Sequence, residues 1–140
     1  MNVVVDASVA IKWFVVENDS AAALVVRSEH DIVAPDFLLI ECRNALLNKV
    51  RRRELKITEA QGVESELDAM GIGIIPSLPF LHAAFTIALD LGEPIYDCIY
   101  LAAAIVTDRK LITADEGFAQ AVARSPIGEA RVGVLGVEQS

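Results

Sequence analysis

The stretch Asn2-Val3-Val4-Val5-Asp6 combines a short run of β-branched residues with an acid that ends it. Such a short, continuously apolar run predicts a strand that is buried on both faces, as in a parallel sheet. A similar stretch, Lys110-Leu111-Ile112-Thr113, lies near the other end of the chain and is followed after one residue by Asp115. Because the carboxyl ends of parallel strands meet at one edge of the sheet, we expect Asp6 and Asp115 to emerge together.

Short β-branched runs alternate with longer helical patterns along the whole chain. The predicted strands are Asn2–Val5, Asp31–Ala34, Ile72–Ile75, Lys110–Thr113 and Val132–Val137. The predicted helices are Ala10–Val16, Ser20–Ser28, Asp36–Arg53, Thr58–Met70, Pro79–Leu91, Ile95–Val106 and Glu116–Arg124. This alternation predicts an α/β fold with a mostly parallel central sheet flanked by helices. The length of 140 residues fits one domain, over residues 1–140.

The composition restricts the class of protein. Hydrophobic residues make up 54% of the chain, which argues against disorder. The net charge of -8 argues against a protein that coats nucleic acid through surface charge, but it leaves open a nuclease whose metal ions supply the positive charge. Cys42 and Cys98 match no zinc or redox spacing and are predicted to be reduced core thiols.

The apolar segments are too short for membrane insertion. The opening residues carry an acid and no preceding basic residues, which is unlike a signal peptide. The run Ile99–Val106 is far shorter than the ~18 residues of a membrane span. We therefore expect a cytoplasmic protein that does not interact with membranes.

Two further acids occupy apolar surroundings. Glu41 lies in Phe37-Leu38-Leu39-Ile40-Glu41-Cys42, and Asp97 begins the most apolar helical pattern of the chain. An unpaired buried carboxylate costs several kcal/mol, so such acids are usually paired or coordinated. Asp97 has no Lys or Arg three or four residues ahead, and Glu41 has only the neutral Asn44 at that spacing. A partner that is distant in sequence remains open for both acids.

Asp6, Glu41, Asp97 and Asp115 are therefore predicted to form one acidic pocket. Like charges about 5 Å apart repel by roughly 3 kcal/mol at an effective dielectric constant near 20, so such a cluster needs a cation or shifted pKa values. Ligation by oxygen alone favours Mg²⁺ or Mn²⁺ over zinc, with Asp6, Asp97 and Asp115 as the expected metal ligands. Such an ion supports phosphodiester cleavage. Taken singly, Asp6 and Asp115 are also interpretable as helix caps.

Four segments carry a resemblance to a known family. They are Val4-Val5-Asp6-Ala7-Ser8, Glu41-Cys42-Arg43-Asn44-Ala45-Leu46, Tyr96-Asp97-Cys98-Ile99-Tyr100-Leu101-Ala102 and Leu111-Ile112-Thr113-Ala114-Asp115. In this order, they resemble the PIN domain, and in particular the VapC-type toxin ribonucleases of type II toxin–antitoxin systems. No segment is decisive alone, but the ordered set spans nearly the whole chain. Cys98 and Ile99 depart from the small residues that are common at these positions in the family.

The resemblance implies a PIN-like three-layer fold and a metal-dependent endoribonuclease with a four-acid site. It also implies a cognate antitoxin that inhibits the site and, usually, a homodimer. Ser8 and Thr113 match hydroxyl positions of the family, which would hold carboxylates or metal-bound water by hydrogen bonds. An ordinary cap or turn is an equally good interpretation of both hydroxyls. Asn44 joins them as a supporting residue.

Basic and aromatic residues offer candidate contacts for RNA. The only dense basic cluster comprises Lys49, Arg51, Arg52 and Arg53, at the end of the helix that carries Glu41. Its cations either stabilise the helix dipole or contact RNA ~12–18 Å along the helix from Glu41, beyond reach of the scissile bond. Lys12 is a further candidate for RNA or partner contact. Tyr96 and Tyr100 are interpretable either as base-stacking residues or as core and dimer contacts.

Two other functions remain open from the sequence. The acidity of the chain also suits a PIN-like binding module, weak or inactive in catalysis, that captures an Arg-bearing partner peptide. An α/β phosphotransfer domain is the other possibility. However, Asp6-Ala7-Ser8 lacks the Asp-x-Asp of haloacid-dehalogenase-type phosphatases, and the paired acids of a response receiver are absent. The metal-dependent ribonuclease fits the four acids best.

Overall fold

The strands predicted from the apolar runs form one parallel sheet in the computed structural model, which describes residues 2–137. The strands are β1 (Asn2–Val5), β2 (Asp31–Pro35), β3 (Gly73–Ile75), β4 (Lys110–Thr113) and β5 (Val132–Val134). The α-helices are α1 (Ala7–Ala10), α2 (Ser20–Glu29), α3 (Phe37–Arg51), α4 (Ile57–Leu67), α5 (Leu81–Leu91), α6 (Ile95–Val106) and α7 (Glu116–Arg124). Short 3-10 turns are η1 (Ile11–Trp13), η2 (Leu78–Phe80) and η3 (Glu129–Arg131).

The strand order is β3-β2-β1-β4-β5, and every neighbouring pair is parallel. The chain winds from β1 outward to β3 and then returns to the other side of β1 to form β4. The switch in winding direction lies between β1 and β4, where Val5 is paired with Ile112. Ligands of open α/β sheets bind at such a switch, outside the carboxyl ends of the strands.

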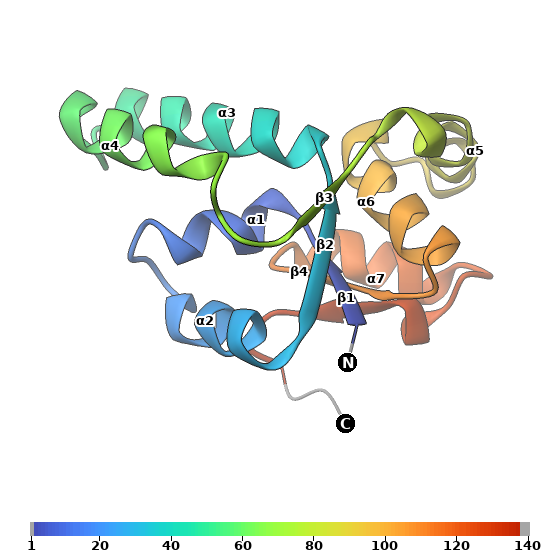
Figure 1. Cartoon of the computed structure of the whole chain (residues 1–140). Helices are drawn as coiled ribbons and strands as arrows, with labels where there is room; N and C mark the ends of the chain where they lie inside the picture. Colours follow the sequence, from blue (N-terminus) through green and yellow to red (C-terminus); the bar gives the residue numbers. More distant parts are fainter. Residues whose placement is uncertain (1, 138–140) are drawn as a thin grey trace.

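Helices cover both sides of the sheet, with α1 to α4 on one side and α5 to α7 on the other (Figure 1). Helix α6 crosses the centre and packs against β1, β2 and β4, and α5 packs against α6. The predicted α/β architecture, with its parallel sheet between helical layers, is confirmed. Among the described residues, no helix is long and apolar enough to cross a membrane.

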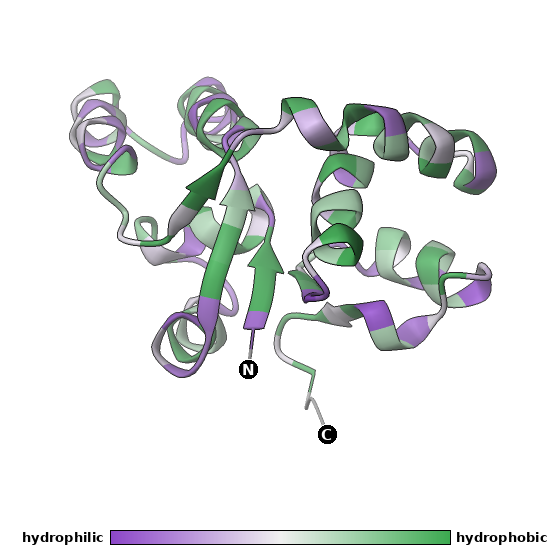
Figure 2. Cartoon of the chain, turned by 45° about the vertical axis from the view of Figure 1, so that its right-hand side comes forward, coloured by the Kyte–Doolittle hydropathy of each residue, from purple (hydrophilic) through white to green (hydrophobic). Residues whose placement is uncertain are grey.

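The core lies between the central strands and α6. Val3, Val4 and Val5 are fully buried, as the continuous apolar run predicted. The side chains of α6 from Cys98 to Ala104 are buried as well. Figure 2 shows the strands and α6 as hydrophobic, whereas the outer helices are hydrophilic on one side. Cys42 and Cys98 are buried free thiols, as predicted.

The largest difference from the sequence prediction concerns the first helix. A helix was expected over Ala10–Val16, but α1 begins at Ala7 and gives way to a 3-10 turn that ends at Trp13. Asp6 caps α1 through a hydrogen bond from the Val9 amide, so the helix starts directly after the strand. The first turn of α1 therefore follows directly on the end of β1, where Asp6 lies.

Other boundaries differ by a few residues. Helix α4 begins at Ile57 rather than at the expected cap Thr58, because the Glu59 carboxylate accepts a hydrogen bond from the Lys56 amide at 2.9 Å. It ends at Leu67, short of the expected Met70. Strand β5 stops at Val134, where the prediction extended to Val137, because Gly136 turns the chain with a φ of 83°.

Candidate active site

Asp6 lies at the carboxyl end of β1 and is only 6% exposed. Its Oδ1 accepts hydrogen bonds from the Ser8 hydroxyl at 2.5 Å and from the Val9 amide at 3.3 Å. Its Oδ2 accepts one from the Thr113 hydroxyl, also at 2.5 Å. The cap interpretation of Asp6 is therefore correct, and the same carboxylate also joins β1 to the end of β4.

The two hydroxyls connect the turns that follow β1 and β4. The Ser8 hydroxyl accepts from the Ala114 amide at 2.9 Å, and the Thr113 hydroxyl accepts from the Asp115 amide at 3.1 Å. Each hydroxyl uses its proton to hold Asp6 and its lone pair to hold the β4–α7 turn. Ser8 and Thr113 therefore orient the Asp6 carboxylate.

Asp115 emerges at the same edge of the sheet, two residues beyond Thr113. It is exposed, and its Oδ1 accepts a hydrogen bond of 3.0 Å from the Phe118 amide. This bond caps α7. Its Oδ2 has no hydrogen-bond partner within residues 2–137. The cap interpretation is correct, and one carboxylate oxygen remains free to bind a ligand.

Glu41 and Tyr100 form the contact that sequence reasoning missed. Glu41 is half-buried on α3, and its Oε1 accepts a hydrogen bond of 2.5 Å from the phenol of Tyr100 on α6. Asn44, expected as the supporting partner, is exposed and makes no hydrogen bond to Glu41 within the described residues. The spacing of three residues between Asp97 and Tyr100 was the available signal, because it places both on one face of a helix.

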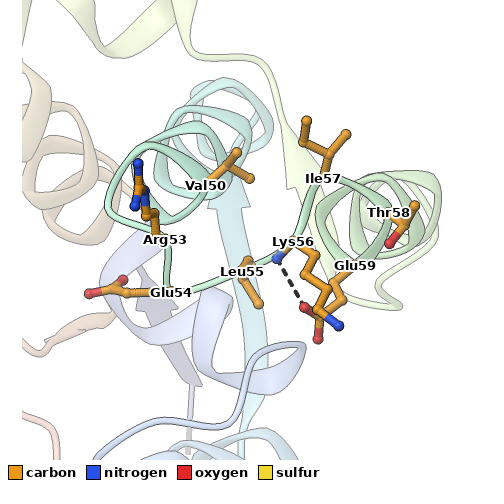
Figure 3. A pocket seen from close by; sticks show the side chains of 8 residues that line it. All are labelled: Val50, Arg53, Glu54, Leu55, Lys56, Ile57, Thr58 and Glu59. Carbon is orange, nitrogen blue, oxygen red and sulfur yellow. Dashed lines mark hydrogen bonds between the residues drawn. The ribbon is translucent and has the colours of Figure 1, made fainter.

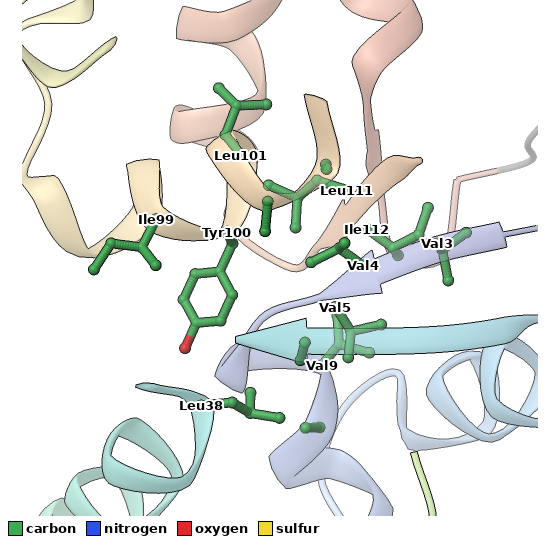
Figure 4. Packing of buried hydrophobic residues seen from close by; sticks show 14 of the residues in the cluster. Val3, Val4, Val5, Val9, Leu38, Ile99, Tyr100, Leu101, Leu111 and Ile112 are labelled. Carbon is green, nitrogen blue, oxygen red and sulfur yellow. The ribbon is translucent and has the colours of Figure 1, made fainter. Parts of the chain in front are cut away.

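Tyr100 is a buried and permanent hydrogen-bond donor. Its side chain is fully buried, and Figure 4 shows the ring reaching from α6 toward the start of α3, with the hydroxyl directed out of the apolar cluster. Burial, followed by the negative charge of Glu41, raises the pKa of the Tyr100 phenol far above its ordinary value. The phenol is therefore in its protonated, hydrogen-bond-donating form at neutral pH.

Asp97 lies in the first turn of α6 and forms no ion pair with Lys or Arg in the described part of the chain. Burial raises its pKa to about 6, and the charges of Asp6, Asp115 and Glu93 add to the increase. Glu93 is thus a fifth acid near the site. It was interpreted from the sequence only as part of the Gly92-Glu93-Pro94 break between two helices.

The pKa shifts of the other acids identify the same neighbours. Burial raises the pKa of Asp6 to about 6 against the opposing effect of its hydrogen bonds, and the charge of Glu41 adds a smaller increase. Burial also raises the pKa of Glu41, with a further contribution from the charge of Asp97. These electrostatic contacts join Asp6, Glu41, Asp97 and Asp115 into one group at the carboxyl edge of the sheet.

The chemistry of this group fits a hard divalent cation. Its donors are carboxylate oxygens, which Mg²⁺ and Mn²⁺ prefer. A cation would also relieve the mutual repulsion that contributes to the raised pKa values. In residues 2–137, however, no three Asp, Glu, His or Cys side chains are already close enough to form a metal site. The acids converge without forming a closed cage, and the metal-ligand assignment of Asp6, Asp97 and Asp115 stays a prediction.

The basic cluster lies at and just beyond the carboxyl end of α3, whereas Glu41 lies near the start of that helix. Lys49 is paired with Glu17 at 2.5 Å and its side chain is only 11% exposed. Lys12 binds the same carboxylate at 3.2 Å. Both lysines, which were candidates for RNA contact, are thus held by an internal acid.

Arg51, Arg52 and Arg53 are the exposed cations of the cluster. Arg53 lines a pocket of about 640 Å³ at the α3–α4 turn, together with Lys56 and Glu59 (Figure 3). None of the four acids lines this pocket. An RNA contact by the three arginines stays a prediction, and it would lie away from the acids.

The PIN domain family model matches residues 3–123, a range that includes all four acids. Ribonuclease VapC3 of Pyrobaculum aerophilum is 31% identical over 123 residues, which cover 86% of this chain and 94% of that protein.

Solved structures share the fold at lower identity. PAE2754 from Pyrobaculum aerophilum superposes with a TM-score of 0.66 at 18% identity, covering 96% of this chain and 84% of that chain. VapC20 of Mycobacterium tuberculosis, described as a sarcin-ricin loop cleaving toxin, superposes with a TM-score of 0.66 at 12% identity. The match covers 92% of this chain and 98% of that chain. VapBC2 from Rickettsia felis, bound to a DNA fragment from its promoter, superposes with a TM-score of 0.62 at 15% identity. The match covers 96% of this chain and 98% of that chain. The predicted three-layer fold is confirmed by this likeness.

The raised pKa of Asp6 predicts a pH-dependent stability in the metal-free protein. Between its ordinary value of 3.8 and about 6, the folded state holds a proton that the unfolded chain has released. The free energy of unfolding should therefore fall as the pH rises through this interval, by on the order of 2–3 kcal/mol in full, at about 1.4 kcal/mol per pKa unit.

Asp6→Asn cannot ionise and should lack this contribution. Urea unfolding in EDTA at pH 4.5 and 7.5 should show the wild-type protein losing roughly 2 kcal/mol relative to the variant between the two pH values. Identical pH dependence in both proteins would contradict the assignment.

Tyr100→Phe tests the contact with Glu41, because it removes only the hydroxyl group. The pKa of Glu41 should rise further, since the Tyr100 hydrogen bond lowers it. The free energy of unfolding at neutral pH should fall by about 1.5–3 kcal/mol, as for a hydrogen bond to a charged group. Carbon-13 NMR of the Glu41 carboxyl group measures the first effect.

Tyr96→Phe is the matched control, because within residues 2–137 no hydrogen bond is formed by the Tyr96 hydroxyl. If Glu41 titrates identically in Tyr100→Phe and in the wild-type protein, the contact does not hold Glu41 in solution.

Proposed function

The chain belongs to the PIN domain family, and we propose that it is a metal-dependent endoribonuclease, the toxin of a toxin–antitoxin pair. The observation that carries the proposal is the convergence of Asp6, Glu41, Asp97 and Asp115 at the switch point of the sheet. Their mutual effects on pKa link all four without a neutralising Lys or Arg from the described residues. The likeness to Ribonuclease VapC3 supports RNA as the substrate.

In this proposal, Asp6, Asp97 and Asp115 hold Mg²⁺ or Mn²⁺. When bound, such an ion lowers the pKa of water and stabilises the leaving oxygen of a phosphoryl displacement. Asp6 is kept in one orientation by Ser8 and Thr113, while Asp115 offers the oxygen that its cap leaves unused. Asp97 contributes from the facing helix.

Glu41 acts as the general base. Its Oε1 is occupied by the Tyr100 phenol, whereas its Oε2 has no hydrogen bond within the described residues. Burial raises its pKa above the ordinary value, which makes a carboxylate a more effective acceptor of a proton from water. The proton of the attacking water therefore passes to Oε2 of Glu41.

Two protein partners belong to the proposal. A cognate antitoxin is supported by the fold similarity to VapBC2 of Rickettsia felis and to a toxin–antitoxin complex from Klebsiella pneumoniae. A second copy of the chain is supported by an exposed apolar stripe along η2 and α5. The stripe consists of Leu78, Leu81, Phe85 and Leu89, which are 77%, 37%, 55% and 68% exposed. A ribonuclease toxin with these partners would act in the cytoplasm, as one domain.

Asp97→Asn tests the catalytic assignment. The variant should keep its fold, because Asp97 forms no ion pair that the substitution would break. Cleavage of a mixed panel of RNAs with Mn²⁺ should fall by at least about 100-fold. Asp90→Asn makes the same chemical change at an exposed position of α5 and should leave cleavage unaffected.

Metal binding separates the enzyme from the binding module. Calorimetric titration of the wild-type protein with Mn²⁺ should show binding that Asp97→Asn weakens. An Asp97→Asn variant that cleaves RNA fully, together with a wild-type protein indifferent to EDTA, would rule out the metal-dependent mechanism.

Phe85→Glu tests the second copy. A charge in the middle of the stripe along η2 and α5 should convert the dimer to a monomer of half the mass in light scattering, because burying an unpaired charge costs several kcal/mol. Gln120→Glu, which adds the same charge on exposed α7, should remain a dimer. A wild-type protein that is monomeric at micromolar concentration would disprove the dimer.

A further inference from the structure

Tyr96 immediately precedes Asp97 in the first turn of α6. Its ring is stacked on the ring of Phe37, with the centroids 5.7 Å apart and the planes 12° from parallel. Phe37 is the first residue of α3, one helical turn before Glu41. The two rings therefore bridge the helices that carry Glu41 and Asp97.

The aromatic row extends from the core to solvent. Tyr100 is fully buried, and the centroid of its ring is 6.3 Å from that of Phe37, which is partly buried. Tyr96, at the outer end, is 55% exposed. The ring is stacked on Phe37, and just over half of the side chain remains exposed to solvent, directly next to Asp97 in the sequence.

The surroundings select the kind of ligand for this ring. Phosphate groups are repelled by an acidic site in a chain of net charge -8, and the paired lysines Lys12 and Lys49 do not offset that repulsion. An uncharged ring instead attracts a nucleobase by stacking, which depends on contact between flat faces rather than on charge. Such an interaction binds RNA without requiring a basic surface.

We propose that Tyr96, supported by Phe37, is a stacking platform for one nucleobase that flanks the scissile phosphate. The inference rests on the proposed ribonuclease function and adds a binding subsite for single-stranded RNA. Because every base has an aromatic face, the platform tolerates different bases and sets the position of the strand rather than its sequence.

The test uses the full chain with Asp97→Asn, so that RNA is bound without being cut. Fluorescence anisotropy with a labelled single-stranded oligoribonucleotide gives the dissociation constant. Tyr96→Ala should weaken binding about 5- to 100-fold, the usual range for the loss of one stacked base. Tyr96→Phe and Tyr96→Trp retain a ring and should bind within about twofold of the parent.

Abasic nucleotides distinguish base stacking from a purely structural role of Tyr96, because a structural role would not depend on which base of the RNA is missing. One abasic nucleotide is placed at successive positions of the RNA, and affinity is measured for the parent and for Tyr96→Ala. At one position, the abasic RNA should weaken binding to the parent by the same factor as Tyr96→Ala, and combining the two changes should cause no further loss. The melting temperature of each variant verifies the fold.

Three results would overturn the platform. The first is an RNA affinity that Tyr96→Ala leaves unchanged. The second is a loss of RNA affinity in Tyr96→Phe as large as that in Tyr96→Ala. The third is that Tyr96→Ala and the abasic nucleotide have additive effects on affinity at every position of the RNA. A change of mass in Tyr96→Ala without an abasic effect would assign the ring to a protein interface instead.

Cleavage by the chain with Asp97 intact, measured with Mn²⁺ on the same RNA, tests the proposed function separately. If the chain cleaves RNA but its RNA affinity does not depend on Tyr96, the platform is ruled out and the ribonuclease function stands. Binding that depends on Tyr96 without any cleavage removes the ribonuclease alone. Absence of both binding and cleavage overturns both.

Discussion

The burial of the Asp6 carboxylate is the constraint on which the site depends. It lies at the switch point between β1 and β4, where both strands end and the chain turns into helices on either side. A carboxylate in this position needs hydrogen bonds, and it receives them from Ser8 and Thr113, which belong to different turns. The same bonds that make burial tolerable also fix the relative positions of the turns that carry Asp6 and Asp115. Stability and site geometry are thus determined by one small network.

The acids of the site are held by neutral donors. Hydroxyl groups and backbone amides bond to Asp6 and Asp115, and a phenol bonds to Glu41. Cations are employed elsewhere, as in the pairing of Lys12 and Lys49 with Glu17. Neutral donors orient a carboxylate without cancelling its charge, so the site keeps the negative potential that attracts a divalent cation. An arginine in the same place would stabilise the protein and would compete with the metal.

The sequence predicts those features of the site that follow from local patterns. Parallel strands with acids at their ends follow from Val3-Val4-Val5-Asp6 and from the matching stretch around Thr113, because burial on both faces requires continuous apolar runs. The partner of Glu41 does not follow, since Tyr100 lies 59 residues away and only tertiary packing joins α3 to α6. The interpretation of Asn44 failed for this reason: it considered only neighbours along one helix. The early start of α1 was missed although a cap was one interpretation of Asp6, because the helical pattern was recognised only from Ala10 onward, whereas the helix capped by Asp6 begins at Ala7.

Helix α6 shows how one apolar segment can combine these roles. Its buried residues from Cys98 onward pack over the centre of the sheet, which fixes the first turn of the helix at the carboxyl edge. Over the first two turns of α6, the helical period places Asp97 and Tyr100 on one face of the helix and Tyr96 beside Tyr100, on the side away from Asp97. Asp97 lies among the acids, Tyr100 reaches Glu41 from the core, and Tyr96 lies outside on Phe37. Because α6 is so firmly buried, a substitution at Tyr96 or Asp97 changes chemistry at the edge while the packing that positions that edge is retained. The apolar character of α6, which made Asp97 conspicuous in the sequence, is therefore also the physical reason that the acid can be held in place against its like-charged neighbours.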